Sequence, residues 1–453
     1  MQNKTSIKFI NHASILVKHG NTALLSDPWY QGDAFHKGWN LIHELSDDEI
    51  SNLLNEVTHI WISHEHPDHF SIMFFKKFGD LIKERKIKML FQETNDKRVE
   101  TFLSKTGYKL EIIKFDSWLK LSEDFEVLCF KDGFYDSGLA IKTTDKTILN
   151  INDCAVIDKA RCREVFKLTG ECDVLLSQFS YAAWKGGIDN SYWRKLAAKE
   201  KLETLKLQVD FFKPKMLIPF ASYVYFSNEL NSYLNDSSNK PIDVINAFLY
   251  KKVKVNVMMP FESFVDFDGD IDNKDSILFW DNAIDSISSK SLKTYESIEI
   301  KQLEESFFKY KERIFKNNTR WFMKFIQIFS PISAFKPIVI EVSDLNANIK
   351  LNIFSEELAT TSSNADISMS SESLNFIMTN TFGFDTLTVN GCFEEETVGG
   401  FSRATRSLAI ENLNNMGISF KPSIIFDIQL ISLFISRLFA ASKKIKAGSE
   451  ALR

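Results

Sequence analysis

The feature that most constrains the fold of this chain is a short apolar segment that runs directly into a cluster of histidines. Residues 57–63 read VTHIWIS, and the next six residues read HEHPDH. A short apolar run rich in β-branched and aromatic residues is typical of a buried strand. Because α/β sheets place their ligand sites beyond the carboxyl ends of their strands, the fold must leave this strand end open to a site.

The spacing of the cluster is typical of a metal centre. His64 and His66 lie two residues apart and can converge on one cation, while Asp68 and His69 can reach a second cation beside it. The alternative is a polar surface loop, but nothing structural requires three imidazoles so close together. The pattern therefore predicts a dinuclear site.

Strand and helix patterns alternate along the first half of the chain. Residues 6–29 alternate short apolar runs with a turn at 18–21, which predicts a hairpin. Further segments predict helices at 47–55 and 192–212, and strands at 125–130, 139–142, 147–151 and 174–177. Interleaved strands and helices indicate an α/β class.

Composition shifts divide the chain into three predicted parts. An acidic stretch around 267–276 ends a catalytic domain at 1–275, and a helical connector follows at 276–335. Residues 336–453 form a predicted C-terminal α+β domain, with strand-like segments such as ADISM and DTLTVNGCF and helices from Phe401. The apolar stretch 424–440 is interrupted by Asp427, Gln429 and Arg437, so it predicts a packed amphipathic helix rather than a membrane span.

Charge and cysteine usage exclude several classes of function. The net charge is −5 and no basic block is long enough to follow a phosphate backbone, so we expect no nucleic-acid partner. The five cysteines form no C-x-x-C pair, which argues against a disulfide framework and a cysteine zinc site. The polar N-terminal segment lacks a signal-peptide pattern, so we expect a cytoplasmic protein. We also expect a small-molecule substrate. Whether the chain forms a homo-oligomer is left open.

The histidine cluster resembles the dinuclear metal motif of the metallo-β-lactamase superfamily. Over residues 6–270 the chain also resembles the metallo-β-lactamase part of the CMP-N-acetylneuraminate hydroxylase family. The matching motifs are Asp27-Pro28-Trp29, Gly32, Ala34-Phe35, Gly38-Trp39, Leu41, His43-Glu44, Ile62-Ser63-His64, Asp132-Gly133, Ile148-Leu149-Asn150, Asp153-Cys154, Pro219-Phe220-Ala221 and Tyr223. The resemblance implies an αββα sandwich, here with a C-terminal α+β extension.

The resemblance also implies a ligand set, although all eight histidines lie at or before His69. Matched by position, Asp132 and Asn228 stand where the superfamily usually has histidines, and Asp153 matches an aspartate that bridges two metals. The implied sites are His64, His66 and Asp132 for one ion and Asp68, His69 and Asp153 for the other, with Asp68 and Asp153 as catalytic carboxylates. The alternatives are that Asp132 shapes a turn before Gly133 and that Asn228 caps a helix.

The metal and the reaction stay open at this stage. Two histidines and a carboxylate are the ligand pattern of non-haem iron oxygenases, while zinc and manganese also suit such ligands. The hydroxylase family carries a Rieske domain that needs C-x-H and C-x-x-H pairs, and these 453 residues contain neither. The alternatives are an iron-dependent oxygenase of a nucleotide sugar with a separate ferredoxin-type donor, a hydrolase of a phosphoester, ester or amide, and a non-catalytic binding protein.

Two further features are candidates for a role in binding. The loop 179–187 mixes aromatic residues, a cation and paired glycines, so Trp184 and Lys185, together with Tyr223, are candidate substrate-binding residues; the alternative is an ordinary surface loop. His12, in a His-Ala pair on the first strand, either supports the metal site or packs in the core. Residues from 336 onwards resemble a sterol-carrier-type domain, for which interaction, dimerisation or lining a pocket are the expected roles.

Overall fold

The structure is a computed structural model that describes residues 4–94, 96–134, 136–265, 267 and 269–426. The chain divides into two compact units, one of residues 1–295 with 386–394 and one of residues 296–385 with 395–453. The predicted boundaries lay at 275 and 335. The division falls instead at 295, so most of the predicted helical connector belongs to the second unit.

The first unit contains two mixed sheets of seven strands each. The first has the order β16 (Ser263–Phe264), β1 (Ser6–Asn11), β2 (Ser14–His19), β3 (Thr22–Ser26), β5 (His59–Ile62), β6 (Lys88–Gln92) and β7 (Lys109–Ile113). The second has the order β15 (Lys254–Val255), β13 (Met216–Phe220), β12 (Val174–Gln178), β11 (Thr147–Asn152), β10 (Asp136–Thr143), β9 (Phe125–Asp132) and β8 (Trp118–Ser122). In each sheet the hairpin-connected strands are antiparallel, and the strands nearest the other edge are parallel.

Successive side chains of the first sheet alternate between two buried faces, one toward the second sheet and one toward the outer helices. Phe9, Val17 and Trp61 belong to the core shared with the second sheet. Their chain neighbours Leu16 and Ile60 belong to a separate core on the opposite face. Successive side chains of a strand point to opposite faces, so a sheet with two apolar faces must be covered on both sides.

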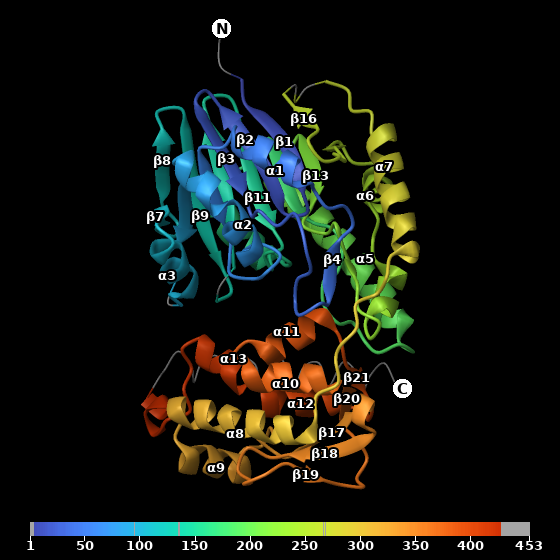
Figure 1. Cartoon of the computed structure of the whole chain (residues 1–453). Coiled ribbons are helices and arrows are strands. Elements are labelled where there is room, and N and C mark those ends of the chain that lie inside the picture. The colour runs from blue at the N-terminus through green and yellow to red at the C-terminus, as the bar shows by residue number, and fades with distance from the viewer. Residues whose placement is uncertain (1–3, 95, 135, 266, 268, 427–453) are drawn as a thin grey trace. The chain divides into compact units, whose positions relative to one another are not determined.

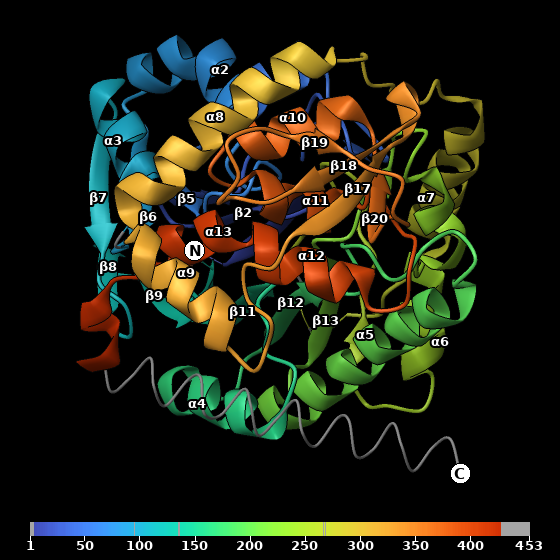
Figure 2. The same ribbon diagram turned by 90° about the horizontal axis from the view of Figure 1, so that it is seen from below.

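Helices cover the outer face of each sheet. The core on the outer face of the first sheet is completed by side chains of α1 (Asp47–Leu54), α2 (Ile72–Glu84) and α3 (Arg98–Lys105). The core of the second sheet includes side chains of α4 (Lys159–Thr169), α5 (Ser191–Phe212) and α6 (Pro241–Phe248). Figure 2 shows α2 and α3 on one side of the two sheets and α4, α5 and α6 on the other. The expected αββα sandwich of the metallo-β-lactamase type is therefore confirmed for this unit.

Most of the predicted elements are present close to their expected bounds. The predicted hairpin at 6–29 is a three-stranded meander of β1, β2 and β3. The predicted strand at 57–63 is β5, which is parallel to β3 and β6 and ends just before the histidine cluster. The helix predicted at 192–212 is α5.

The second unit combines helices with a small sheet, as Figure 1 shows in yellow, orange and red. Helices α8 (Ile300–Asn317), α9 (Arg320–Phe329), α10 (Ser371–Thr379), α12 (Gly400–Leu408) and α13 (Ile410–Asn415) belong to it. Its sheet has the order β19 (Ala359–Thr360), β18 (Ala347–Leu351), β17 (Ile338–Val342), β20 (Ile367–Met369) and β21 (Glu394–Glu395), although Glu394 itself groups with the first unit.

One predicted strand is wrong. The segment DTLTVNGCF, expected to be a strand, lies largely in helix α11 (Gly383–Asn390). Threonine and valine favour strands, but Phe384 and Leu387 are three residues apart and both are buried, a spacing that places them on one face of a helix. Tertiary burial therefore overrides the local preference.

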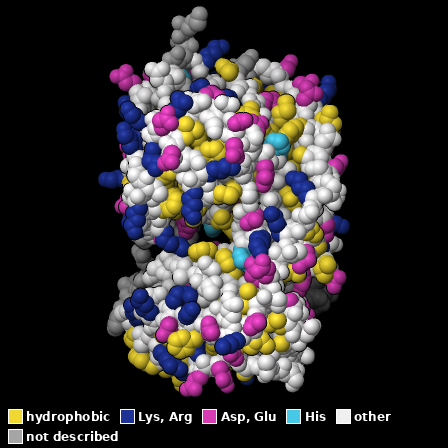
Figure 3. Space-filling model, in the orientation of Figure 1, with side chains coloured by type: hydrophobic (Ala, Val, Ile, Leu, Met, Phe, Trp, Pro, Cys, Tyr) yellow, Lys and Arg dark blue, Asp and Glu magenta, His cyan; other side chains and the backbone are white. Residues whose placement is uncertain are grey.

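Within the described part of the chain, no helix has the length and hydropathy needed to cross a bilayer. The amphipathic helix predicted over 424–440 lies outside the described residues from 427 onwards. On the face drawn in Figure 3, basic and acidic side chains are interspersed.

Residues 386–394 group with the first unit although they come late in the sequence. The side chain of Asn390 is buried, and its Nδ2 donates to the Phe35 carbonyl at 3.1 Å. Its Oδ1 accepts from the Cys392 N–H at 2.9 Å. Asn231 Nδ2 donates to the carbonyls of Gly38 and Asn390 at 2.9 and 2.7 Å. Buried polar bonds of this kind hold the late segment in place.

Asn390→Ala should therefore destabilise the first unit. The substitution leaves the Cys392 N–H without its acceptor and removes one of the two hydrogen bonds to the Phe35 carbonyl, which lowers the free energy of unfolding by about 1–3 kcal/mol. Urea unfolding of the full chain measures this change. Asn364→Ala, at an exposed position, is the matched control and should leave the unfolding free energy unchanged. Equal stability of the two variants would contradict the role given to Asn390.

Candidate metal centre

A tight turn after β5 gathers the histidine cluster into a buried site. The N–H groups of His69 and Phe70 both donate to the His66 carbonyl, at 3.0 and 2.7 Å, so the chain curls back on itself. Ser71 then caps α2 by accepting from the Phe74 N–H at 3.2 Å. The short reach from strand to helix leaves His64 and His69 fully buried at the strand ends.

One group of three side chains forms around His64. Its Nε2 lies 2.8 Å from His66 Nδ1 and 3.8 Å from Oδ1 of Asp136, the first residue of β10. Ligand atoms of His64, His66 and Asp136 all lie within 4.8 Å of one another. Two imidazoles and one carboxylate thus surround a common point.

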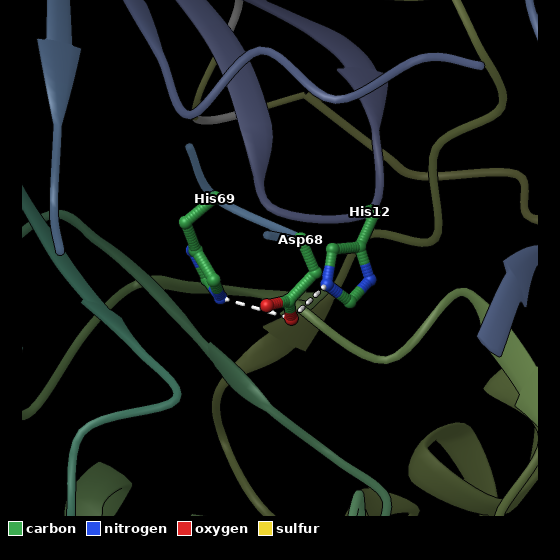
Figure 4. A group of neighbouring side chains, drawn as sticks. All are labelled: His12, Asp68 and His69. Atoms are coloured by element: carbon green, nitrogen blue, oxygen red, sulfur yellow. Dashed lines mark hydrogen bonds and ion pairs between the residues drawn. The ribbon is translucent and has the colours of Figure 1, made fainter. Parts of the chain in front are cut away.

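A second group forms around Asp68. Figure 4 shows His12 and His69 pointing at the Asp68 carboxylate from opposite sides. Asp68 Oδ2 lies 3.4 Å from His12 Nε2 and 3.2 Å from His69 Nε2. The pattern of the sequence left open whether His12 packs in the core or supports the site. It lies in the turn between β1 and β2, is buried and also contacts Asp68, so both descriptions apply to it.

Asp153 lies between the two groups. Its Oδ2 is 3.4 Å from His69 Nε2 and 3.8 Å from His64 Nε2. It follows β11, which runs parallel to β12, so it stands at the carboxyl end of the second sheet. A carboxylate in this position can contact ions held by either group.

The donor atoms suit metal ions. Metal–ligand bonds of about 2.0–2.2 Å place neighbouring ligand atoms about 3–3.4 Å apart, close to the spacings found here. Asp68 Oδ1 and Asp153 Oδ1 are buried and make no hydrogen bond to any described residue. Buried carboxylate oxygens without partners are costly, and a bound cation would satisfy them.

The histidine rings are oriented by groups behind them. Asp27 accepts at 3.0 Å from Nδ1 of His69, which leaves Nε2 of that ring directed at Asp68 and Asp153. Asp27 also accepts from the Ser63 N–H at 2.7 Å and from Asn152 Nδ2 at 2.8 Å. A carboxylate behind a ligating histidine fixes its tautomer and raises its basicity.

Electrostatics at the site call for positive charge. Burial lowers the pKa of His64 well below its usual value, so the ring is neutral and its lone pair is available. Burial also opposes a charge on His69, but Asp68, Asp153 and Asp27 together raise the pKa of that ring well above its usual value. Burial raises the pKa of Asp136 to about 7. The negative charges of Asp68, Asp153 and Asp27 thus favour a positive charge beside them, either a proton on His69 or a metal ion.

Two of the predicted ligands lie elsewhere. Asp132 accepts from the Ala155 N–H at 2.6 Å and from Arg161 Nε at 3.1 Å, and among the described residues it belongs to no candidate metal group. Asn228 Oδ1 accepts from the Leu230 N–H at 3.1 Å in a local turn. We propose Asp136 in place of Asp132 in the ligand set, because the carboxylate of Asp132 is already engaged by a guanidinium and a backbone N–H. Asn228 as a ligand stays a prediction.

Asp136 is the residue that sequence reasoning missed. It pairs directly with Asp132 across the hairpin of β9 and β10, so both ends of the turn carry an aspartate. The spacing of the two aspartates was visible in the sequence, but which of them faces the histidines depends on the twist of the hairpin. Asp27 and His12 lie in motifs that the sequence analysis identified. Their contacts with His69 and Asp68 form only when the strands pair in the folded sheet.

The predicted substrate-binding residues have different surroundings. Tyr223 is buried, packs against Trp280 with 4.2 Å between ring centroids and donates to the Pro219 carbonyl, so it lies in the core. Trp184 is buried against Phe393, with ring centroids 4.8 Å apart. Lys185 is only partly buried.

About half of this chain is similar in sequence to one group of known enzymes. No protein-family model matches it. It is 28% identical over 251 residues to the cytidine monophosphate-N-acetylneuraminic acid hydroxylase of Danio rerio, covering 52% of this chain and 41% of that protein. The Xenopus laevis hydroxylase is 27% identical over 253 residues (52% and 41%), and a Homo sapiens protein named as inactive is 26% identical (52% and 48%). The chain thus spans less than half the length of these relatives.

Solved structures of similar fold share little sequence. CmlA, a diiron β-hydroxylase from Streptomyces venezuelae, has a TM-score of 0.43 at 13% identity, covering 58% of this chain and 55% of that one. Human tRNase Z, short form, has a TM-score of 0.35 at 13% identity, covering 57% and 98%. At these scores we transfer no residue role from either protein.

Removing the carboxylate behind His69 should weaken metal binding. In Asp27→Asn the side chain no longer carries the charge that orients His69, so we expect metal affinity to fall by about 10- to 100-fold. Metal titration against a competing chelator measures the affinity, and circular dichroism checks the fold. Asp33→Asn, at an exposed position, is the control and should bind as the parent does. An unchanged affinity in Asp27→Asn would remove Asp27 from the site.

The two hairpin aspartates provide a second, matched test. Asp136→Asn should lose most of the metal held with His64 and His66, because it removes the only carboxylate of that group. Asp132→Asn should retain its metal, since the Asp132 carboxylate bonds Arg161 instead. Elemental analysis of both purified variants decides between them. Loss of metal in Asp132→Asn alone would restore Asp132 as the ligand.

Proposed function

We propose that this chain is a dinuclear metal-dependent enzyme that hydroxylates its substrate with iron and molecular oxygen. The observation that carries the proposal is the ligand group of His64, His66 and Asp136. Two histidines and one carboxylate with open positions form the facial pattern of non-haem iron oxygenases. Iron bound there would supply the site at which oxygen is activated.

The chain's own residues hold and orient this centre. His69 is aimed by Asp27, and Asp153 lies within reach of both ligand groups. Burial of His64 and His69 keeps bulk water away from the rings. The partly exposed carboxylates of Asp136 and Asp153, whose side chains are 32% and 22% exposed, mark the side from which a substrate approaches.

The names of the sequence relatives support hydroxylation of a nucleotide sugar. Those relatives are called CMP-N-acetylneuraminic acid hydroxylases, and the similarity covers the part of the chain that carries the metal centre. Hydroxylation inserts one oxygen atom into a C–H bond and reduces the other to water, which consumes two electrons and two protons. These 453 residues lack the paired Cys and His motifs of a Rieske centre, so in this proposal a ferredoxin-type donor outside them supplies the electrons.

A hydrolase is the second candidate, and a specific observation favours it. Asp153 lies between the His64 and His69 groups, so its carboxylate can bridge two ions. Paired ions of this kind activate water and stabilise the negative charge that develops on a phosphoester or amide. In this case Asp68 and Asp153 are the catalytic carboxylates, and zinc or manganese replaces iron.

Metal content and product identity separate the two candidates. We expect protein purified under anaerobic conditions to hold iron in excess of zinc, and to add one oxygen atom to CMP-N-acetylneuraminate when oxygen, ferredoxin and a reductant are present. Elemental analysis and mass spectrometry measure the two quantities. His66→Ala should lose most of its metal and all turnover. Zinc as the resident metal, with phosphoester or amide cleavage that needs no reductant, would replace this proposal by the hydrolase.

A further inference from the structure

A lysine lies beside the metal centre and is tied to the end of β12. Asn152, the last residue of β11, pairs with Ser177 of β12, so the end of β11 that precedes Asp153 lies beside the end of β12. Gln178 Nε2 donates to the Ala221 carbonyl at 3.3 Å, and Gln178 Oε1 accepts from Nζ of Lys201 on α5. Figure 2 shows α5 lying along this sheet, next to β12 and β13. The Lys201 ammonium is therefore held at the strand ends.

A second lysine reaches the same region from the loop between β12 and α5. Lys185 is partly buried, and within the described part of the chain it makes no hydrogen bond and no ion pair. Two nearby charges act on the pKa of Lys201: the positive charge of Lys185 lowers it and the negative charge of Asp153 raises it. The acidic group that acts on Lys185 is Glu200, which is exposed.

The two ammonium groups lack a charged partner of their own. Lysine normally extends its ammonium to water, but Lys201 instead donates to the neutral amide of Gln178. Burial lowers the pKa of both lysines, that of Lys201 to about 8, because a charge removed from water without a counterion is unfavourable. The carboxylate whose charge acts on Lys201 is Asp153, which faces His64 and His69.

We propose that Lys185 and Lys201 together bind a phosphate-sized anionic group of the substrate beside the metal centre. With one Lys201 N–H bonded to Gln178, the two ammonium groups leave five N–H donors and two positive charges for an anion. Inorganic phosphate or a phosphate monoester carries about 1.5–2 negative charges at neutral pH. The phosphodiester of a CMP-linked sugar carries one. Binding of the anion supplies the missing counterion, and Gln178 keeps the Lys201 ammonium at the strand end. The role as a substrate contact rests on the proposed function, whereas the anion site itself rests on the lysines.

Calorimetric titration of the full-length, metal-loaded protein with inorganic phosphate tests the site. Lys185→Gln and Lys201→Gln should each bind phosphate about 10- to 100-fold more weakly, the loss expected for a charged hydrogen bond. Lys201→Arg should retain most of the affinity because it preserves the charge, and it also guards against misfolding. Lys199→Gln, exposed on the same helix, is the control and should bind as the parent does. Acetate, with a single charge, should bind more weakly than phosphate.

The His66→Ala variant separates this proposal from the metal-dependent function. Phosphate binding that survives metal loss in His66→Ala but is weakened by Lys201→Gln supports the anion site even if the enzyme proves not to hydroxylate. Phosphate binding that disappears with the metal and is unchanged in both lysine variants would overturn the anion site. In that second case the metal content and turnover of the lysine variants would remain those of the parent.

Discussion

The first unit depends on the network of hydrogen bonds that converges on the Asp27 carboxylate. Asp27 follows β3, and its two oxygens accept from the backbone of Ser63, from Asn152 and from His69. These three partners come from the ends of β5 and β11 and from the turn before α2. One buried carboxylate thus links the ends of both sheets, and losing it would affect fold and site together.

The same centre explains the charge arrangement around it. Buried Asp68 and the partly exposed Asp136 and Asp153 lie among imidazole rings, and a bound cation would satisfy the buried oxygens of Asp68 and Asp153 that make no hydrogen bond to a described residue. The charge of Asp153 also acts on Lys201, and Lys201 in turn lies within the electrostatic range of Lys185. In the proposed site, a cation would balance the carboxylates and an anionic group of the substrate would balance the two lysines.

Sequence reasoning worked best where a pattern has one structural solution. The apolar run before His64 is β5, and the alternating residues of the first strands divide between two cores. It failed where tertiary contacts outweigh local preference. The segment around Leu387 has strand-forming residues, yet it forms α11 because Phe384 and Leu387 are buried on one helical face. Residues 386–394 also group with the first unit, which no local pattern indicates.

The sequence by itself determined that His64, His66, Asp68 and His69 lie together, because neighbours in the chain at a strand end cannot be far apart. It did not determine which distant carboxylates join them. Asp132 and Asp136 begin and end one hairpin turn, and only the twist and register of β9 and β10 decide that Asp136 faces His64 while Asp132 bonds Arg161. The approach of Lys201 to Gln178 likewise depends on how α5 packs along β12. Local order follows from the chain, whereas the complete site follows from packing between elements far apart in it.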